Sequence, residues 1–256
     1  MNVQSATKCL AACVLVLISG AFSFDLLGQT PGGGMADAML AAIRDGRLDL
    51  VQAGIREGMD PNLRNTYGTS LLMQAAASGK VEIARFLLAN GATPKATGNE
   101  AIVAEAALYN HIEIVRMLVE AGAPLNAPRT EKNRKDVLVE AVRHDNLEMF
   151  KYLLDHGANP KGVGLFEDTA LQMASSKGNL EMMRLLLSHG ADVNQVDQNG
   201  WTALMRACRS GKKEAVVLLL ANGADPAMKD KGGKTAAMFA QCEHHEEIEA
   251  ICAGKP

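Results

Sequence analysis

The chain has 256 residues and a formal net charge of −3 at pH 7, so no overall basic field points to nucleic acid as its partner. Aromatic residues make up only 4% of the sequence. Alanine, leucine and methionine are plentiful instead, which suits closely packed helices.

The first 23 residues differ from the rest of the chain. Lys8 precedes an apolar run over 9–18, and small residues follow at 19–21. This order predicts a secretory signal peptide over 1–23, cleaved after Ala21 or Ser23. The run is short for a membrane span, which needs about 20 apolar residues, and an uncleaved N-terminal membrane anchor is the alternative. Cys13 ends a segment similar to a lipoprotein box, but its place inside the apolar run argues against lipidation.

A glycine-rich segment over 24–34 is predicted to form a flexible tether, because it contains Pro31 and three successive glycines. Removal of the signal peptide would leave Cys208, Cys242 and Cys252. An odd number of cysteines without regular spacing argues against a fold that depends on disulfides.

From residue 35 onward, a pattern of about 33 residues repeats along the chain. Its clearest marks are the glycines that close each unit, Gly58, Gly91, Gly122, Gly157, Gly190 and Gly223. Such a period indicates stacked helical units with one continuous core. We predict an elongated all-α domain over 35–254, with repeats at about 35–65, 66–96, 97–131, 132–164, 165–197 and 198–230 and a partial cap at 231–254.

Each unit contains two helices separated by a tight turn. The residue types at the turn enter the left-handed region more readily than others, and they are Gly46, Gly79, Asn110, Asp145, Gly178, Gly211 and His244. Alanine stands four residues before every turn, at Ala42, Ala75, Ala106, Ala141, Ala174, Ala207 and Ala240. We expect left-handed turns throughout, and we expect the alanines to let neighbouring helices approach closely.

The second helix of each unit is amphipathic and ends at Gly-Ala. In one copy, Val81, Ile83 and Leu87 follow helical spacing, whereas Glu82 and Arg85 occupy the other face. We predict that the apolar stripe faces a neighbouring helix pair and that the charges face solvent. The closing glycine is predicted to cap the helix in a left-handed conformation.

These units resemble ankyrin repeats. The segment 200–204, Gly-Trp-Thr-Ala-Leu, is similar to the G-x-T-P-L-H opening of the ankyrin pattern, and 186–194 matches its L-L-x-x-G-A-D-V-N ending. The resemblance extends over about 35–253. It implies an all-α ankyrin-repeat solenoid of helix-turn-helix units joined by hairpin loops. Hairpins around 92–99 and 123–135 depart from the pattern, and we interpret the second as a solvated loop, with an extended finger as the alternative.

Ankyrin-type proteins generally bind partners through hairpin tips and the concave face of their first helices. The resemblance therefore implies a partner-binding set, carried over copy by copy, of Tyr109, Arg143, His144, Lys177, Trp201 and Arg209. Basic residues in this set, within an acidic chain, favour a partner with an acidic surface. Trp201 beside Arg209 is the preferred anchor, because Trp and Arg are enriched at interface hot spots. The alternative is that Trp201 only packs over the next hairpin.

The sequence predicts no catalytic residue, no cofactor and no metal site. No G-x-S-x-G, Walker-type or H-E-x-x-H motif occurs. Cys242, His245 and Glu246 have metal-ligand spacing, but we interpret them as the polar outer face of a terminal cap.

The sequence thus predicts a non-catalytic protein-binding scaffold, monomeric and exported to the periplasm or secreted. We expect no nucleic-acid partner, and we expect no stable membrane span once the signal peptide is cleaved. An immunity or inhibitor protein against a toxin of that compartment, and a secreted host-directed effector, are the alternatives.

Overall fold

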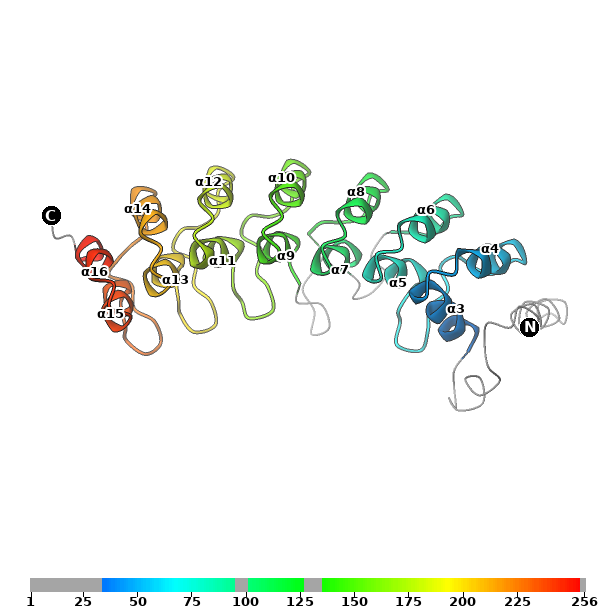
Figure 1. Cartoon of the computed structure of the whole chain (residues 1–256), viewed down its shortest axis with the longest axis horizontal. Helices are drawn as coiled ribbons and strands as arrows, with labels where there is room; N and C mark the ends of the chain where they lie inside the picture. The colour runs from blue at the N-terminus through cyan, green and yellow to red at the C-terminus, as the bar shows by residue number, and fades with distance from the viewer. Residues whose placement is uncertain (1–33, 95–100, 127–134, 254–256) are drawn as a thin grey trace. The chain divides into compact units, whose positions relative to one another are not determined.

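The computed structural model describes residues 34–94, 101–126 and 135–253, and the chain forms two compact units, Met1–Pro124 and Leu125–Pro256. Figure 1 shows the helices of each unit arranged in pairs. The predicted signal peptide, nearly all of the predicted tether and the middle of the predicted 123–135 loop lie outside the described residues. They stay predictions, as do the domain and repeat boundaries.

In the first unit, three helix pairs follow one another. Each first helix contacts the next first helix, and each second helix contacts the next second helix. The first helices are α3 (Met35–Arg44), α5 (Leu71–Ala77) and α7 (Ile102–Leu108), and the second helices are α4 (Leu48–Arg56), α6 (Val81–Ala89) and α8 (Ile112–Glu120).

The second unit contains four helix pairs of the same kind. Its first helices are α9 (Val137–Arg143), α11 (Ala170–Lys177), α13 (Ala203–Arg209) and α15 (Ala236–Cys242). Its second helices are α10 (Leu147–Asp155), α12 (Leu180–Ser188), α14 (Lys213–Ala221) and α16 (Glu246–Cys252). The first helices contact one another in chain order. In the described residues the only β structure is a pair of isolated bridges, Arg64 to Ser70 and Val163 to Thr169, so the all-α prediction is confirmed.

Side-chain caps set where several first helices begin. Thr169 and Thr202 each accept a hydrogen bond from the backbone N–H three residues later, and Thr169 forms a full capping box with Gln172. Ser70 and Asp136 cap α5 and α9 in the same way. These caps satisfy N–H groups that have no partner within the helix. None of these four helices has proline at its first position.

The predicted alanines all lie in the core. Ala42 is 2% exposed, and its counterparts in the other six copies are fully buried. The second helices bury one stripe each, for example Ile83 with Leu87 on α6 and Met182 with Leu186 on α12. Both the close-packing alanines and the apolar stripes are therefore confirmed.

All seven inter-helix turns adopt positive φ, including those at Asn110 (φ 61), Asp145 (φ 52) and His244 (φ 59). At Gly79 and Gly211 a second constraint applies, because the rings of His111 and His245 lie where a Cβ would stand. Each ring belongs to the following helix pair and covers the turn of the pair before it. Glycine is needed at these two turns for space as well as for conformation.

Neighbouring helix pairs are also joined by asparagine side chains. The amide of Asn194 donates to the carbonyl of Gly223 at 3.1 Å and accepts from the backbone N–H of Asp225 at 2.9 Å. Asn62 makes the same two contacts with Gly91 and Thr93 in the first unit, and Asn126 makes them with Gly157 and Asn159 inside the second unit. We call each of these arrangements an asparagine clasp.

Candidate partner-binding face

The first helices of the second unit end in a row of polar residues, two before each inter-helix turn. We call this the pre-turn row, and it consists of Arg143, His144, Ser176, Lys177, Arg209, Ser210, Cys242 and Glu243. Four of the predicted site residues stand in it, and all four are exposed: Arg143, His144, Lys177 and Arg209. The contacts between successive first helices place the row along one side of this unit.

The fifth predicted residue, Tyr109, belongs to the first unit. It follows α7, is 51% exposed, and stacks on His111 with ring centroids 6.2 Å apart. The pre-turn row belongs to the second unit and does not include Tyr109.

The basic side chains of the row already face carboxylates of the same chain. Arg143 Nε donates to Glu140 at 2.9 Å, and the Glu140 side chain is only 4% exposed. Lys177 Nζ donates to Asp145 at 2.7 Å and to the backbone carbonyl of Arg143 at 2.9 Å. These neighbours orient both cations and offset part of their charge.

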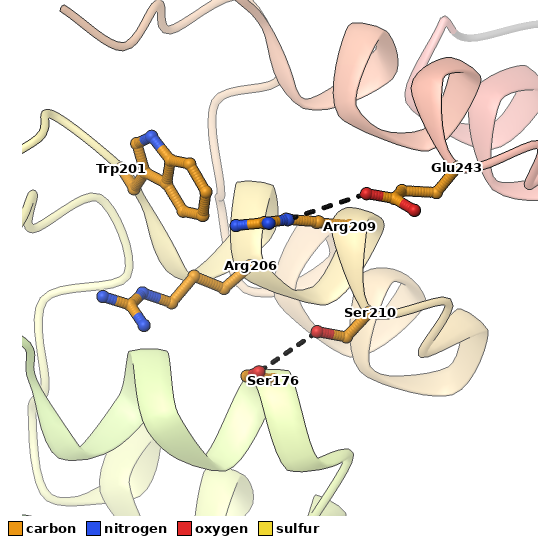
Figure 2. Close-up of a pocket in the computed structure, with 6 residues that line it drawn as sticks. All are labelled: Ser176, Trp201, Arg206, Arg209, Ser210 and Glu243. Carbon is orange, nitrogen blue, oxygen red and sulfur yellow. Dashed lines mark hydrogen bonds and ion pairs between the residues drawn. The ribbon is translucent and has the colours of Figure 1, made fainter.

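A pocket of about 280 Å³ opens beside the row, lined by Ser176, Trp201, Arg206, Arg209, Ser210 and Glu243. Figure 2 shows the Arg209 guanidinium between the Trp201 ring and the Glu243 carboxylate. The guanidinium carbon of Arg209 lies 5.0 Å from the ring centroid, and its Nε lies 3.7 Å from Glu243. Ser176 and Ser210 share a hydrogen bond of 3.1 Å on the other side. We call this the Trp201 pocket.

Trp201 itself is half-buried and held on two sides. Its indole N–H donates to Asp230 of the next hairpin at 3.1 Å, and its ring meets the Phe239 ring edge-on at 4.7 Å between centroids. Trp201 therefore packs against the next hairpin and α15, and its contact with a partner stays a prediction. Packing also fixes the ring in place as one wall of the pocket.

An ion pair between Arg206 and Asp197 lies next to the pocket, and the repeat pattern did not predict it. Arg206 donates to Asp197 at 2.6 Å, and the Asp197 side chain is 1% exposed. Asp197 also accepts from the backbone N–H groups of Asn199 and Trp201, so it closes the hairpin and anchors the helix that follows. The sequence did hold a signal for this pair. Arg206 occupies a helix position at which the neighbouring copies have the apolar residues Met173 and Phe239.

Exposed apolar side chains at two hairpin tips were also missed. Leu165 and Phe166 are 48% and 55% exposed, and Val196 on the next hairpin is 43% exposed. A hydrogen bond from Gln195 to the carbonyl of Lys161 links these hairpins. The signal was a pair of large apolar residues between Gly164 and Asp168, where a solvated tip would be polar.

The described part of the chain offers little for other kinds of site. No three His, Cys, Asp or Glu side chains among the described residues are placed to hold a metal ion. Nor does any described helix have the length and apolar character needed to cross a membrane.

Comparison with known proteins identifies the repeated unit. The family model described as ankyrin repeats (3 copies) matches residues 38–129, 100–163, 138–230 and 189–254. A putative ankyrin repeat protein of fowlpox virus is 35% identical over 120 residues, which is 46% of this chain and 27% of the viral protein. A putative ankyrin repeat-containing protein of Treponema pallidum is 32% identical over 124 residues, which is 47% of this chain and 41% of the relative. The matches thus span less than half of either relative.

Two solved structures have the same fold. The human ASB11 ankyrin repeat domain superposes with a TM-score of 0.69 at 26% identity, covering 85% of this chain and 98% of that domain. The ankyrin repeat domain of Bcl-3, a member of the IkappaB protein family, superposes with a TM-score of 0.64 at 25% identity. The match covers 89% of this chain and 99% of the Bcl-3 domain.

Proposed function

This chain belongs to the ankyrin repeat family, and on that basis we propose that it is a non-catalytic scaffold that binds a partner protein through the pre-turn row of its second unit. Ankyrin repeats indicate protein interaction. The observation that carries the choice of face is the Trp201 pocket, where an aromatic ring and a guanidinium meet in a depression beside exposed polar residues.

The pocket has the properties of an interface hot spot. Trp and Arg are the residue types most enriched at such positions. The contacts of Trp201 with Asp230 and Phe239 hold the ring before any partner arrives, so little conformational entropy is lost on binding. Leu165, Phe166 and Val196 add exposed apolar surface at the hairpin tips of the same unit.

We further propose that the partner presents an acidic surface. Arg143, Lys177 and Arg209 already contact Glu140, Asp145 and Glu243. Binding would therefore exchange one carboxylate for another, which gives orientation and a faster encounter rather than a large net affinity. His144 is exposed in the same row and adds a hydrogen-bonding group.

Photo-crosslinking tests the face. A photoreactive residue at His144, in the second unit, should capture a partner that the same group at Val217, on α14, does not. Arg209→Glu should then weaken capture, whereas Lys213→Glu should not. The two cations are a matched pair, since Arg209 faces Glu243 and Lys213 faces Glu247, with side chains 53% and 50% exposed. Equal loss from both variants, or from neither, would reject the pre-turn row as the binding face.

Export is part of the proposal, with the periplasm or the exterior as destination and residues 1–23 as the signal. The basic Lys8, the apolar run over 9–18 and the small residues after it support this. A compartment-sensitive reporter fused after Lys255 should report export from the full chain and lose it when 2–23 are deleted. A cytoplasmic signal from the full chain would refute export, and a membrane-bound, uncleaved product would favour the anchor.

A toxin-inhibiting role is the second candidate, favoured by the pre-organised Trp201 pocket. An inhibitor would bind with nanomolar or tighter affinity, whereas an adaptor protein would bind more weakly, and titration calorimetry with the captured partner distinguishes them. A host-directed effector would instead be found beyond the envelope. We expect a monomer in each case, which light scattering would check.

A further inference from the structure

Two buried cysteines from different helix pairs meet at the end of the second unit. Cys208 lies on α13 and is fully buried, and Cys252 is the last residue of α16 and is 7% exposed. Their sulfur atoms are 3.0 Å apart although 44 positions separate them in sequence. The third cysteine of this region, Cys242, is exposed and does not share the contact.

We propose that Cys208 and Cys252 are a site of oxidative modification, at which a small-molecule or protein disulfide converts the thiol pair into an internal disulfide. The sulfurs need to approach by only about 1 Å to reach the S–S bond length of about 2 Å. Such a bond would join α16 directly to α13. α16 packs mainly against α15 and α14, so the bond would add a covalent link across α15.

Exchange with a disulfide oxidant accounts for all atoms and electrons. The Cys252 sulfur, as thiolate, attacks one sulfur of the oxidant and releases the other half as a thiolate. Cys208 then loses its proton to solvent and attacks the Cys252 sulfur, which releases the second half. The protein gives up two electrons and two protons, and the oxidant leaves as two thiols.

The local chemistry supports this order of events. Cys252 is the more exposed residue of the two and ends the last helix, so an oxidant reaches it first. The hydrogen bond between the two groups lowers the pKa of the Cys252 thiol, whereas that contact together with burial raises the pKa of Cys208. The thiolate is the attacking species in exchange, so Cys252 is the nucleophile and Cys208 the resolving cysteine.

Oxidation of the full reduced protein by oxidised glutathione tests the proposal, followed by acid quenching, alkylation and peptide mapping. Trypsin combined with a glutamyl endopeptidase separates Cys242 from Cys252, because Glu243, Glu246, Glu247 and Glu249 lie between them. We expect a peptide that links Cys208 to Cys252, while Cys242 is alkylated or carries glutathione. The link should survive in Cys242→Ser and disappear in Cys252→Ala.

The same oxidation in concentrated urea provides the decisive control. In an unfolded chain, loop-closure entropy favours the nearby Cys242 and Cys252 over the distant pair. The folded protein should reverse this preference, with Cys208–Cys252 in excess. A native product dominated by Cys242, or thiols at 208 and 252 that both remain free after prolonged oxidation, would overturn the proposal.

Hydrogen exchange gives a second readout that needs no variant of a buried residue. Oxidation should slow amide exchange in α16 by about tenfold or more, because the crosslink disfavours local opening. Dithiothreitol should restore the original rate. Unchanged exchange in α16 after complete oxidation would show that the bond does not hold this helix, and would also overturn the proposal.

Discussion

The guanidinium carbon of Arg209 lies 5.0 Å from the centre of the Trp201 ring, while the Nε of the same side chain lies 3.7 Å from Glu243. One cation therefore bridges a hairpin residue and the end of α15. Because its side chain is 53% exposed, solvent screens both contacts and their contribution to stability is small. Arg209 acts chiefly on the shape and charge of the pocket. Its replacement should therefore change partner binding while leaving the free energy of unfolding nearly unchanged.

Trp201, in contrast, should affect folding. We expect Trp201→Ala to lower the free energy of unfolding by about 2 kcal/mol, since it removes the ring contact with Phe239 and the hydrogen bond to Asp230. Trp201→Phe keeps most of the ring contact and should cost about 1 kcal/mol. Urea denaturation followed by circular dichroism measures both, because the chain has a single tryptophan and its fluorescence is lost. Identical midpoints for the wild type and Trp201→Ala would contradict this role.

The Arg206–Asp197 pair is predicted to stabilise the second unit. Arg206→Ala leaves the Asp197 carboxylate buried without its cation, at a cost of about 2 to 3 kcal/mol, which is discounted because Arg206 is 24% exposed. Thermal unfolding measures the loss. Lys213→Ala, which breaks the exposed pair with Glu247, is the control and should leave the melting temperature unchanged. Equal effects of the two variants would mean that burial of Asp197 has no energetic consequence.

Substitutions at the turn glycines can separate the backbone cost of a left-handed conformation from the steric cost of an added Cβ. Gly79→Ala should lower the free energy of unfolding by at least about 1 to 2 kcal/mol, from the left-handed backbone alone. A steric cost adds to this, because the new Cβ would lie 2.5 Å from the His111 ring. Gly91→Ala has positive φ but no atom within 4 Å, so it isolates the backbone component. His111→Ala should recover part of the loss in the Gly79→Ala background only, and a failure to do so would exclude the clash.

Close packing of the first helices predicts the effect of a larger residue in their core. Ala174 is fully buried on α11, so Ala174→Leu should lower the free energy of unfolding by about 1 to 3 kcal/mol through overpacking. Arg184→Leu on the exposed face of α12 should change it by less than about 0.5 kcal/mol. An unchanged urea midpoint for Ala174→Leu would mean that the helices can separate at no cost.

Acid titration should reveal the Lys213–Glu247 contact. The hydrogen bond from Lys213 lowers the pKa of the Glu247 carboxyl. The contact favours the fold when the pH is above the carboxyl pKa of the unfolded chain, and this effect is lost as the pH falls through the pKa of the folded protein. Both groups are exposed, so the effect is too small to move the melting temperature. Lys213→Ala should return the pKa of Glu247 toward its ordinary value, measured by carboxyl chemical shifts. The absence of any change would show that the contact is not formed in solution.

The sequence was sufficient for features that the period determines. Asn110, Asp145 and His244 were predicted to keep the left-handed turn, and all three do so. The ion pairs were not predictable in the same way, because they depend on how copies face one another. Lys177 contacts Asp145 of the preceding pair, and Arg206 contacts Asp197 only because the hairpin curls back over its own helix. Side-chain partners of this kind depend on rotamers and hairpin paths, which a repeat period does not specify.

The asparagine clasps have a consequence for how such a chain can evolve. Each clasp uses one side-chain amide and two backbone groups of the next helix pair, and in the Asn62 clasp the Thr93 hydroxyl adds a third hydrogen bond. A duplicated or deleted unit would therefore meet the same backbone groups at its new junction. The number of units can change by recombination without a compensating substitution at the clasp.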